Sequence, residues 1–311
     1  MLRKQTLTWF VVIGATLCPL AASCTAATET GASSDTTPSE TVSTPKPTSS
    51  SKPPHSSAKA TPQKIPREFD PKNFDAGGSN VNQWVPTTPG VQVIRKGFVN
   101  VGGRRIPHVT VTTITDVTKK IDGVRAVLIL DQDIDGGQIS EQAVDYLAED
   151  VGGNVWYLGS YTEAYEGGQF LNAQDGWLAG VNGAIAGLFF PGDPTPGSAP
   201  FFQVQVPGGE QSSAQVVKAG QRKCVPFDCF KDVIVVEEGG AEYKYWARGV
   251  GQILTEPLSG VAQETEELIN VKELSSSALA ELSAEVLKLD AHAAQTVPSV
   301  FGPSAPAVRE R

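Results

Sequence analysis

The sequence predicts a mainly β domain, built on a curved antiparallel sheet and followed by a C-terminal helix. From about residue 84, short runs rich in Val, Ile, Thr and aromatic residues alternate with Gly, Asp and Pro, which is the pattern of strands and turns. No amphipathic segments separate these runs, although a parallel sheet would need crossover helices there. We expect one folded domain over residues 69–295, since both ends of the chain have a poor composition for a core.

The first two predicted strands, residues 91–99 and 105–115, are joined by a turn at Gly102 and Gly103. In the second strand His108 shares a face with Thr110 and Thr112. We interpret His108 as a surface or half-buried strand residue. Further strands are predicted at residues 124–134, 138–148, 154–158, 184–190, 201–206, 215–218, 232–237, 242–246, 251–254 and 266–271.

One segment, residues 276–293, has helical periodicity. Its apolar residues recur at spacings of three and four, and Ser275 to Ser277 offer N-cap residues. We expect this helix to pack on the sheet, with a groove of a partner protein as the alternative. The tail, residues 296–311, contains three prolines and is expected to be disordered or extended. The apolar stripe consists of Leu279, Leu282, Val286, Leu289 and Ala293.

The N-terminus has the order of an export signal over residues 1–23, with Arg3 and Lys4 before an apolar stretch. Small residues then precede Cys24, as in a bacterial lipobox, where the cysteine is acylated. We expect an anchor at Cys24 on the extracytoplasmic face of the cell membrane; ordinary signal cleavage nearby is the alternative. Residues 24–68 are rich in Ser, Thr and Pro and are predicted to form a disordered stalk.

The chain carries a net charge of -9 and has a pI near 5.0. Nucleic acids and anionic lipid surfaces attract clustered Lys and Arg, so this balance disfavours nucleic acid as a partner. The predicted contact with the membrane is the lipid anchor.

Asp131, Asp133 and Asp135, followed by Gly136, match the opening of a calcium-binding loop. The match then fails, because Gln142 stands where a bidentate carboxylate is needed and the flanks are predicted strands. We therefore expect a solvated hairpin tip, with a non-helical cation site as the alternative.

Cys224 and Cys229 are the two cysteines left in the predicted mature domain, and they lie close in the sequence. In an oxidising compartment they are expected to form a structural disulfide. A metal site would need further His or Cys ligands nearby, and redox-active pairs usually enclose two residues.

The sequence has no recognised hydrolase motif, and no cofactor is predicted. Carboxylate pairs such as Glu163 and Glu166 resemble ordinary loop charges. Aromatic residues are the better candidates for ligand contact, because amphipathic rings suit lipids and glycans. Core packing of a curved sheet is the alternative for them. These candidates are Trp156, Tyr157, Trp177, Tyr245 and Trp246.

Several motifs resemble those of a family of secreted bacterial proteins, of actinobacterial type and many of them lipoproteins, to which no activity is assigned. The motifs are Gly-Asn-Val-Trp-Tyr-Leu-Gly at 153–159, Gly-Val-Asn-Gly-Ala at 180–184 and Lys-Tyr-Trp-Ala-Arg-Gly-Val-Gly at 244–251. The resemblance covers about residues 74–274 and implies one contiguous domain. The closing strand is also similar to those of half-barrel lipoprotein-binding folds, an analogy of architecture only.

This chain has neutral residues where members of that family tend to carry acidic or imidazole groups, which speaks against the same acid–base chemistry. We therefore expect a surface-anchored protein that is not an enzyme and that binds a lipid or an envelope glycan or has a structural role. A cation-dependent or carboxylate-based hydrolase is the alternative. The neutral positions are Ser160, Tyr161, Leu178, Asn182 and Tyr243.

Overall fold

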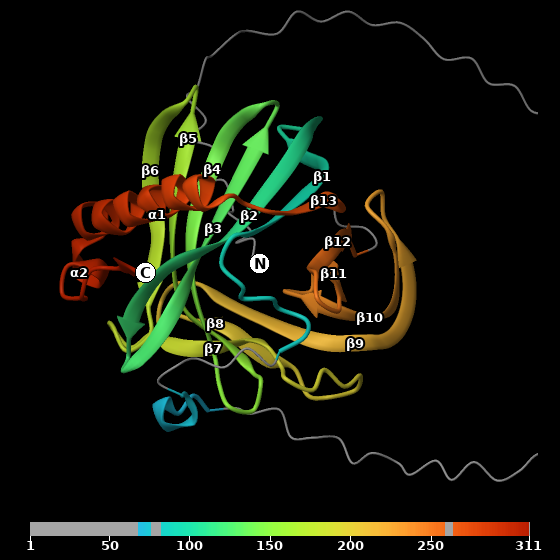
Figure 1. Cartoon of the computed structure of the whole chain (residues 1–311), viewed down its shortest axis with the longest axis horizontal. Coiled ribbons are helices and arrows are strands. Elements are labelled where there is room, and N and C mark those ends of the chain that lie inside the picture. The colour runs from blue at the N-terminus through green and yellow to red at the C-terminus, as the bar shows by residue number, and fades with distance from the viewer. Residues whose placement is uncertain (1–67, 76–81, 259–263, 311) are drawn as a thin grey trace, which may run out of the picture. The chain divides into compact units, whose positions relative to one another are not determined.

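Twelve antiparallel strands close into a barrel in the computed structural model, which describes residues 68–75, 82–258 and 264–310 (Figure 1). The order around the barrel is β1-β13-β12-β11-β10-β9-β8-β7-β5-β4-β3-β2, and pairing of β1 with β2 closes it. The mainly β prediction is confirmed, but the sheet closes fully and is not a half-barrel. The strands are β1 (Val91–Val101), β2 (Arg104–Ile121), β3 (Val124–Asp135), β4 (Gln138–Glu149), β5 (Val155–Glu166), β6 (Gln169–Leu178), β7 (Ile185–Phe190), β8 (Phe201–Gln205), β9 (Gln211–Cys224), β10 (Cys229–Glu238), β11 (Glu242–Ala247), β12 (Gly251–Pro257), β13 (Thr265–Glu273) and β14 (Val308–Arg309).

Local sequence accounts for most of these strands, and β6 is the main exception. Its residues, QFLNAQDGWL, include no Val, Ile or Thr and mix two aromatic residues with Asn, Asp and Gly, which are rare in strands, so strand propensity marks it weakly. Pairing with β5 forms it instead, and the same pairing extends β5 to Glu166 beyond the predicted end at residue 158. Tertiary contact therefore decides the structure of this hairpin.

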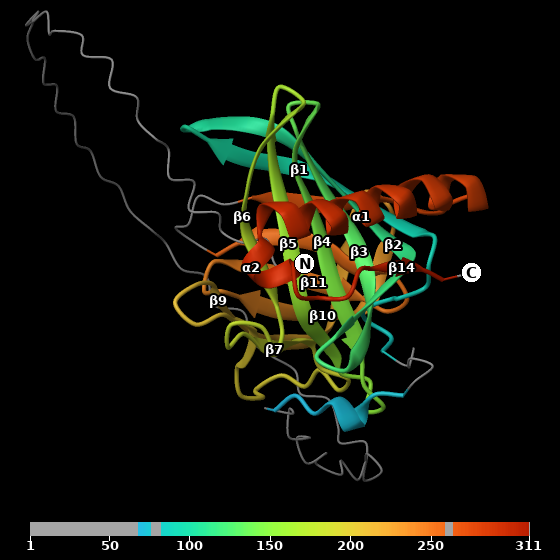
Figure 2. The same cartoon turned by 90° about the vertical axis from the view of Figure 1, so that its left-hand side faces the viewer.

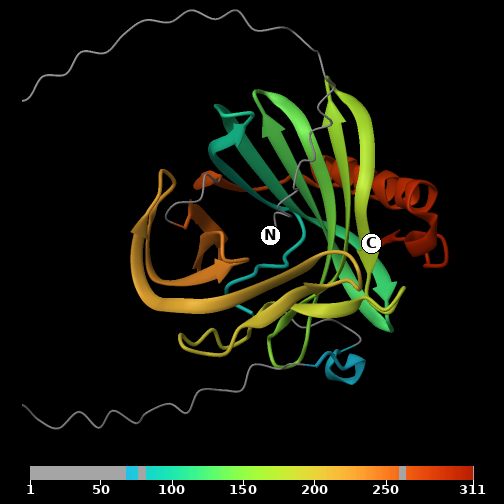
Figure 3. The same cartoon turned by 180° about the vertical axis from the view of Figure 1, so that it is seen from behind.

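The second half of the sheet curves strongly, and β9 and β10 wrap around β11 and β12 (Figures 1 and 3). The hairpin that joins β9 to β10 reaches β13, where Phe227 N–H donates to the carbonyl of Leu268 over 3.1 Å. An apolar cluster fills this part of the domain. Its buried members are Val93, Val225, Val233, Ala247, Ile253, Leu254 and Leu268.

Helix α1 (Ser276–Thr296) crosses the outer face of the wall formed by β2 to β6 (Figures 1 and 2). The Ser275 hydroxyl caps it by accepting from Ala278 N–H over 3.2 Å. Val286, Leu289 and Ala293 are buried, so the predicted stripe packs on the sheet of the same chain. At the far end of the helix, His292 Nδ1 lies 2.7 Å from a carboxylate oxygen of Glu163 on β5.

A buried ion pair ties α1 to the barrel wall. Lys119 Nζ of β2 lies 2.8 and 3.0 Å from the two carboxylate oxygens of Asp290. Tyr146 Oη and Ala307 N–H also donate to Asp290, each over 2.9 Å. Every strong acceptor direction of this buried carboxylate is therefore used, as burial of a charge requires.

The C-terminal tail differs from the predicted disordered or extended segment. Residues Pro298–Phe301 form a short helix, α2, and Phe301 is 1% exposed. Strand β14 then pairs with β2, while Arg309 forms an ion pair with Asp116 over 2.8 Å. The prolines end α1 without preventing the segment from docking, because docking needs side-chain burial and only two residues of strand.

Neither helix in the described part of the chain combines the length and hydrophobicity needed to cross a membrane.

We expect Asp290→Asn to destabilise the protein by about 3–5 kcal/mol, because it leaves the Lys119 ammonium buried without its counter-charge. Chemical denaturation measures this. The matched control is Lys288→Gln on the same helix, since Lys288 is 76% exposed and pairs with Glu285 near the surface. The control should cost less than about 0.5 kcal/mol. A loss below about 1 kcal/mol for Asp290→Asn would contradict a structural role for the pair.

Candidate functional site

The inner face of the barrel carries polar side chains on neighbouring strands. Since α1 covers the outer face of β2 to β6, side chains on the opposite side of these strands point into the barrel. On β2 and β3, His108 is registered with Asp135, Thr110 with Asp133, and Thr112 with Asp131. Thr112 donates to Asp131 over 2.8 Å and Thr110 to Asp133 over 3.2 Å, so each pair lies on one face.

Strands β1 and β13 extend this face across the barrel closure. Gly97 of β1 is registered with His108 on one side and with Glu266 on the other. A Cβ atom at Gly97 would lie 1.6 Å from the carbonyl oxygen of Thr265, so the position requires glycine. With no side chain between them, His108 and Glu266 meet across β1.

His108 lies at the centre of this group and is 0% exposed. Its Nδ1 is 2.6 Å from Asp135 Oδ1, and its Nε2 is 3.2 Å from both Glu264 Oε1 and Glu266 Oε1. The Thr110 hydroxyl lies 2.9 Å from Nε2 and also contacts Glu266. We call Asp131, Asp133, Asp135, Glu264 and Glu266, together with His108 and Arg95, the acidic cluster.

Arg95 is the permanent cation of the acidic cluster. It is 3% exposed, and its Nε lies 3.2 Å from Glu266 Oε2 while Nη2 donates to Thr112 over 3.1 Å. Burial and the neighbouring Asp133 charge raise the pKa of Asp131 to about 7, against the opposing effect of Arg95. Asp131 therefore changes protonation near neutral pH.

The turn predicted at Gly136 and Gly137 is present, since Asp135 ends β3 and Gln138 begins β4, but two other predictions about these residues are wrong. Asp131 and Asp133 are not part of a solvated tip, because they lie within β3 and Asp133 is 5% exposed. His108 is fully buried and is neither a surface nor a half-buried residue. The alternation of three carboxylates at every second residue is the period of a strand face, and this signal was available in the sequence. Glu264 and Glu266 were missed because they approach from β13 and the residue just before it, far along the chain.

The predicted aromatic candidates divide between several places. Trp156 is 3% exposed, and its Nε1 donates to Asp150 over 2.9 Å. Tyr245 is partly buried beside the apolar cluster, and its hydroxyl donates to Glu256 over 2.6 Å. The other three, 2–4% exposed, join Phe189 in edge-to-face contacts with centroid distances of 5.3–5.9 Å. We call this group the aromatic row; it runs Trp177, Tyr157, Phe189, Trp246.

The aromatic row faces the same side as the acidic cluster. Trp177 is registered with Ser160, Ser160 with Asp145, and Asp145 with Ile129 of β3. The Tyr157 hydroxyl donates to Asp145. Burial and the Asp145 charge raise the pKa of Tyr157 well above its usual value, so this hydroxyl stays a neutral donor.

A second buried ion pair lies beside the aromatic row. Lys244 Nζ is 2.8 Å from Glu238 and 3.3 Å from Glu242. Burial would lower the pKa of Lys244, but Glu238 and Glu242 raise it overall, so the ammonium remains charged. Gln203 donates to Glu238 over 3.1 Å.

Four buried polar atoms along these strands have no hydrogen-bond partner among the described residues. They are the Nε1 donors of Trp177 and Trp246 and the Oε1 acceptors of Gln203 and Gln252. These residues are 1–5% exposed. An unmet buried polar atom costs about 1–3 kcal/mol, so each of them needs a physical explanation.

Cys224 and Cys229 form a disulfide, as the sequence indicates, and they are also registered partners at the tip of the β9–β10 hairpin. The bond closes the hairpin next to the contact between Phe227 and Leu268. Its place at the end of the hairpin is structural.

A surface cleft of about 380 Å³ lies elsewhere, between Trp84, Asp193, Gly220 and Arg248. The Arg248 guanidinium covers the Trp84 ring at 4.2 Å from its centroid. The ring that would stack on a ligand is therefore already occupied, and we favour the inner face as the candidate site.

Stability should depend on pH through Asp131. Because its pKa of about 7 in the folded state lies above the usual aspartate pKa of 3.8, only the folded state keeps the proton between these values, and stability falls as pH rises through this window. Asp131→Asn removes this effect. The free energy of unfolding, measured by urea denaturation, should rise for the variant relative to the parent by up to about 4 kcal/mol on going from pH 4 to pH 8. If the difference in free energy of unfolding between variant and parent is the same at pH 4 and pH 8, the pKa of Asp131 is not raised.

Searches against family models and curated proteins gave no match, so the family resemblance stays a prediction. Two solved structures are similar in part. A protein from Bacteroides fragilis, described as exported and of YmcC-like fold, is 13% identical with a TM-score of 0.34; it covers 62% of this chain and 100% of its own. A protein from Parabacteroides distasonis described as a lipoprotein is 14% identical with a TM-score of 0.32, covering 60% and 97%. These values carry no functional argument.

Proposed function

We propose that this protein is a lipid-anchored binding protein on the extracytoplasmic face of the cell membrane, and that it binds an envelope glycan inside its barrel without catalysis. The observation that carries the proposal is the set of four buried polar atoms that lack partners, two donors and two acceptors. A ligand with hydroxyl and amide groups supplies both kinds of partner, as sugars do.

The charge of the inner face favours a glycan over an acyl chain. Asp133, Asp145 and Glu266 are 4–6% exposed. An acyl chain would add apolar surface beside these buried charges without offering them any hydrogen bond, which is unfavourable. Sugar hydroxyls donate to carboxylates, and the apolar faces of sugar rings pack on aromatic side chains. The acidic cluster and the aromatic row together offer both kinds of contact.

A carboxylate-based hydrolase is the second candidate, and one observation favours it. Asp131 lies on the inner face with a pKa of about 7, where a carboxyl can both accept and donate a proton at neutral pH. Incubation with host envelope glycans distinguishes the two candidates. Binding without cleavage products supports the binding protein, and released fragments that disappear with Asp131→Asn support the hydrolase.

The glycan proposal is tested by native mass spectrometry of the protein purified from its host, followed by titration of the glycan so identified. Trp177→Phe removes the unmet Nε1 donor and keeps an aromatic ring, so affinity should fall about tenfold. The variant loses buried ring volume, as its control does, but no hydrogen bond to a described residue, so its stability should fall less than that of the control.

Trp156→Phe is the matched control. Its Nε1 already donates to Asp150, so this variant should lose about 1 kcal/mol of stability and no affinity. If the purified protein carries no glycan and Trp177→Phe binds envelope glycans as the parent does, the proposed ligand class is wrong.

Anchoring is tested separately at Cys24, which lies outside the described residues. Cys24→Ser should move the protein from the membrane fraction to the soluble fraction, because acyl chains supply the stable membrane affinity. Mass spectrometry of the parent should show an acylated cysteine at the mature N-terminus. An unmodified terminus in the parent would contradict the anchor.

A further inference from the structure

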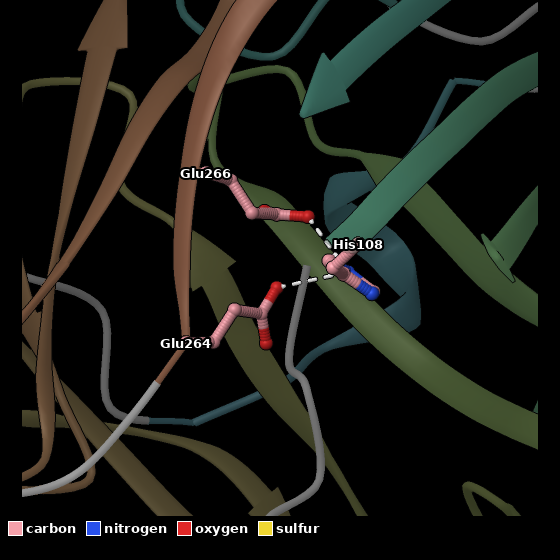
Figure 4. A group of neighbouring side chains, drawn as sticks. All are labelled: His108, Glu264 and Glu266. Atoms are coloured by element: carbon pink, nitrogen blue, oxygen red, sulfur yellow. Dashed lines mark ion pairs between the residues drawn. The ribbon is translucent and has the colours of Figure 1, made fainter. Parts of the chain in front are cut away.

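We infer that His108, Glu264 and Glu266 form a binding site for a divalent transition-metal ion of the zinc class. The inference rests on the proposed function only in placing a ligand inside the barrel. The three side chains point toward one another from β2 and from the start of β13 (Figure 4). One ligand atom from each residue lies within 4.8 Å of the other two.

The distances fit a metal ion at the centre of the group. Zinc bonds to His nitrogen and to carboxylate oxygen are about 2.0–2.2 Å long, so two ligands at a tetrahedral angle lie roughly 3.4 Å apart. Here Nε2 of His108 is 3.2 Å from Glu264 Oε1 and 3.2 Å from Glu266 Oε1. The imidazole nitrogen therefore already stands from each carboxylate at the separation that metal coordination requires, and the three ligand atoms lie within 4.8 Å of one another.

The other nitrogen of His108 is held as in metal centres. Nδ1 lies 2.6 Å from Asp135 Oδ1, so the ring donates its Nδ1 proton to this carboxylate. The lone pair of a neutral ring is then on Nε2, which faces Glu264 and Glu266 and also the Thr110 hydroxyl at 2.9 Å, a neutral group that a metal ion would displace or share. A carboxylate that orients a ligating histidine in this way is a common feature of zinc sites.

Gln252 gives an observation independent of the three ligands. It is 5% exposed, and its Oε1 has no partner among the described residues. Its Nε2 donates over 2.7 Å to Thr255, whose hydroxyl lies 3.4 Å from Glu266 Oε2. Gln252 is thus linked through Thr255 to Glu266, so its amide oxygen without a partner lies two hydrogen bonds from the group.

The donor set selects among metals. One imidazole nitrogen with two carboxylate oxygens suits zinc and manganese, whereas calcium prefers six to eight oxygen ligands. Only three protein ligands are assigned, which leaves coordination positions open. A hydroxyl-bearing ligand in the barrel can occupy one of them, and this links the metal to the proposed glycan.

The test uses the full chain purified from its host, stripped with a chelator and titrated with Zn²⁺ against a chromophoric competitor. We expect one equivalent bound with micromolar or tighter affinity. Glu264→Gln and His108→Gln should each weaken binding at least tenfold, and Asp135→Asn should weaken it by about 10–100-fold. Calcium and magnesium at millimolar concentration should not compete.

Glu267→Gln is the matched control, because Glu267 neighbours Glu266 on β13 but is exposed. It should bind Zn²⁺ as the parent does. Circular dichroism checks that each variant is folded. A second measurement needs no variant, since Co²⁺ bound to the parent at this site should give visible d–d absorption that Zn²⁺ abolishes.

Absence of a one-equivalent Zn²⁺ site and of the Co²⁺ spectrum in the parent would overturn the inference. Equal Zn²⁺ affinity of the parent and of folded Glu264→Gln would do the same. If the protein binds zinc but no glycan, the proposed function is wrong and the metal site stands. If it binds a glycan but has no zinc site, only the metal site is wrong.

Discussion

Closure of the barrel depends on β1, which pairs with β2 along one edge and β13 along the other. Closure removes the exposed edges that an open curved sheet would present. At Gly97 the backbone of β13 comes so close that no side chain can be accommodated. The same glycine leaves the row from His108 to Glu266 without an intervening side chain. The contact that closes the sheet therefore also assembles the acidic cluster.

Buried charges are balanced on the outer face of the barrel wall, whereas carboxylates are in excess on its inner face. On the outer face, Lys119 and Asp290 form a one-to-one pair, and Tyr146 and the Ala307 amide complete the hydrogen bonds of the carboxylate. In the acidic cluster, five residues carry carboxylates and Arg95 carries the one permanent positive charge among the described residues of the group. The outer arrangement is what stability of the fold requires. The inner arrangement raises the pKa of Asp131 and has a desolvation cost, which is typical of functional sites.

Local patterns in the sequence predict most of the strands, the C-terminal helix and its buried stripe, because period and turn residues act over short distances. They do not predict closure or β6, which depend on pairing between segments. In the candidate site, too, some features follow from local sequence and others from contacts between distant segments. The shared face of His108, Thr110 and Thr112 follows from alternation, but Thr110 contacts Glu266 across 156 positions of sequence. The three aspartates of β3 were misinterpreted because a loop motif and a strand face both place carboxylates at alternate residues.

The interior has two chemically distinct halves, and their junction limits what a ligand must be. The acidic cluster presents carboxylates and one imidazole, whereas the aromatic row presents rings and unmet indole donors. Asp145 connects the two halves. Its charge contributes to the raised pKa of Asp131, and its carboxylate accepts a hydrogen bond from the Tyr157 hydroxyl. The carboxylates of the acidic cluster are already bonded to Thr110, Thr112, His108 and Arg95, whereas the two indole donors have no partner among the described residues. In our two proposals a metal ion at the cluster and a hydroxyl-bearing ligand at the aromatic row would share the interior, which is why the proposals belong to one site.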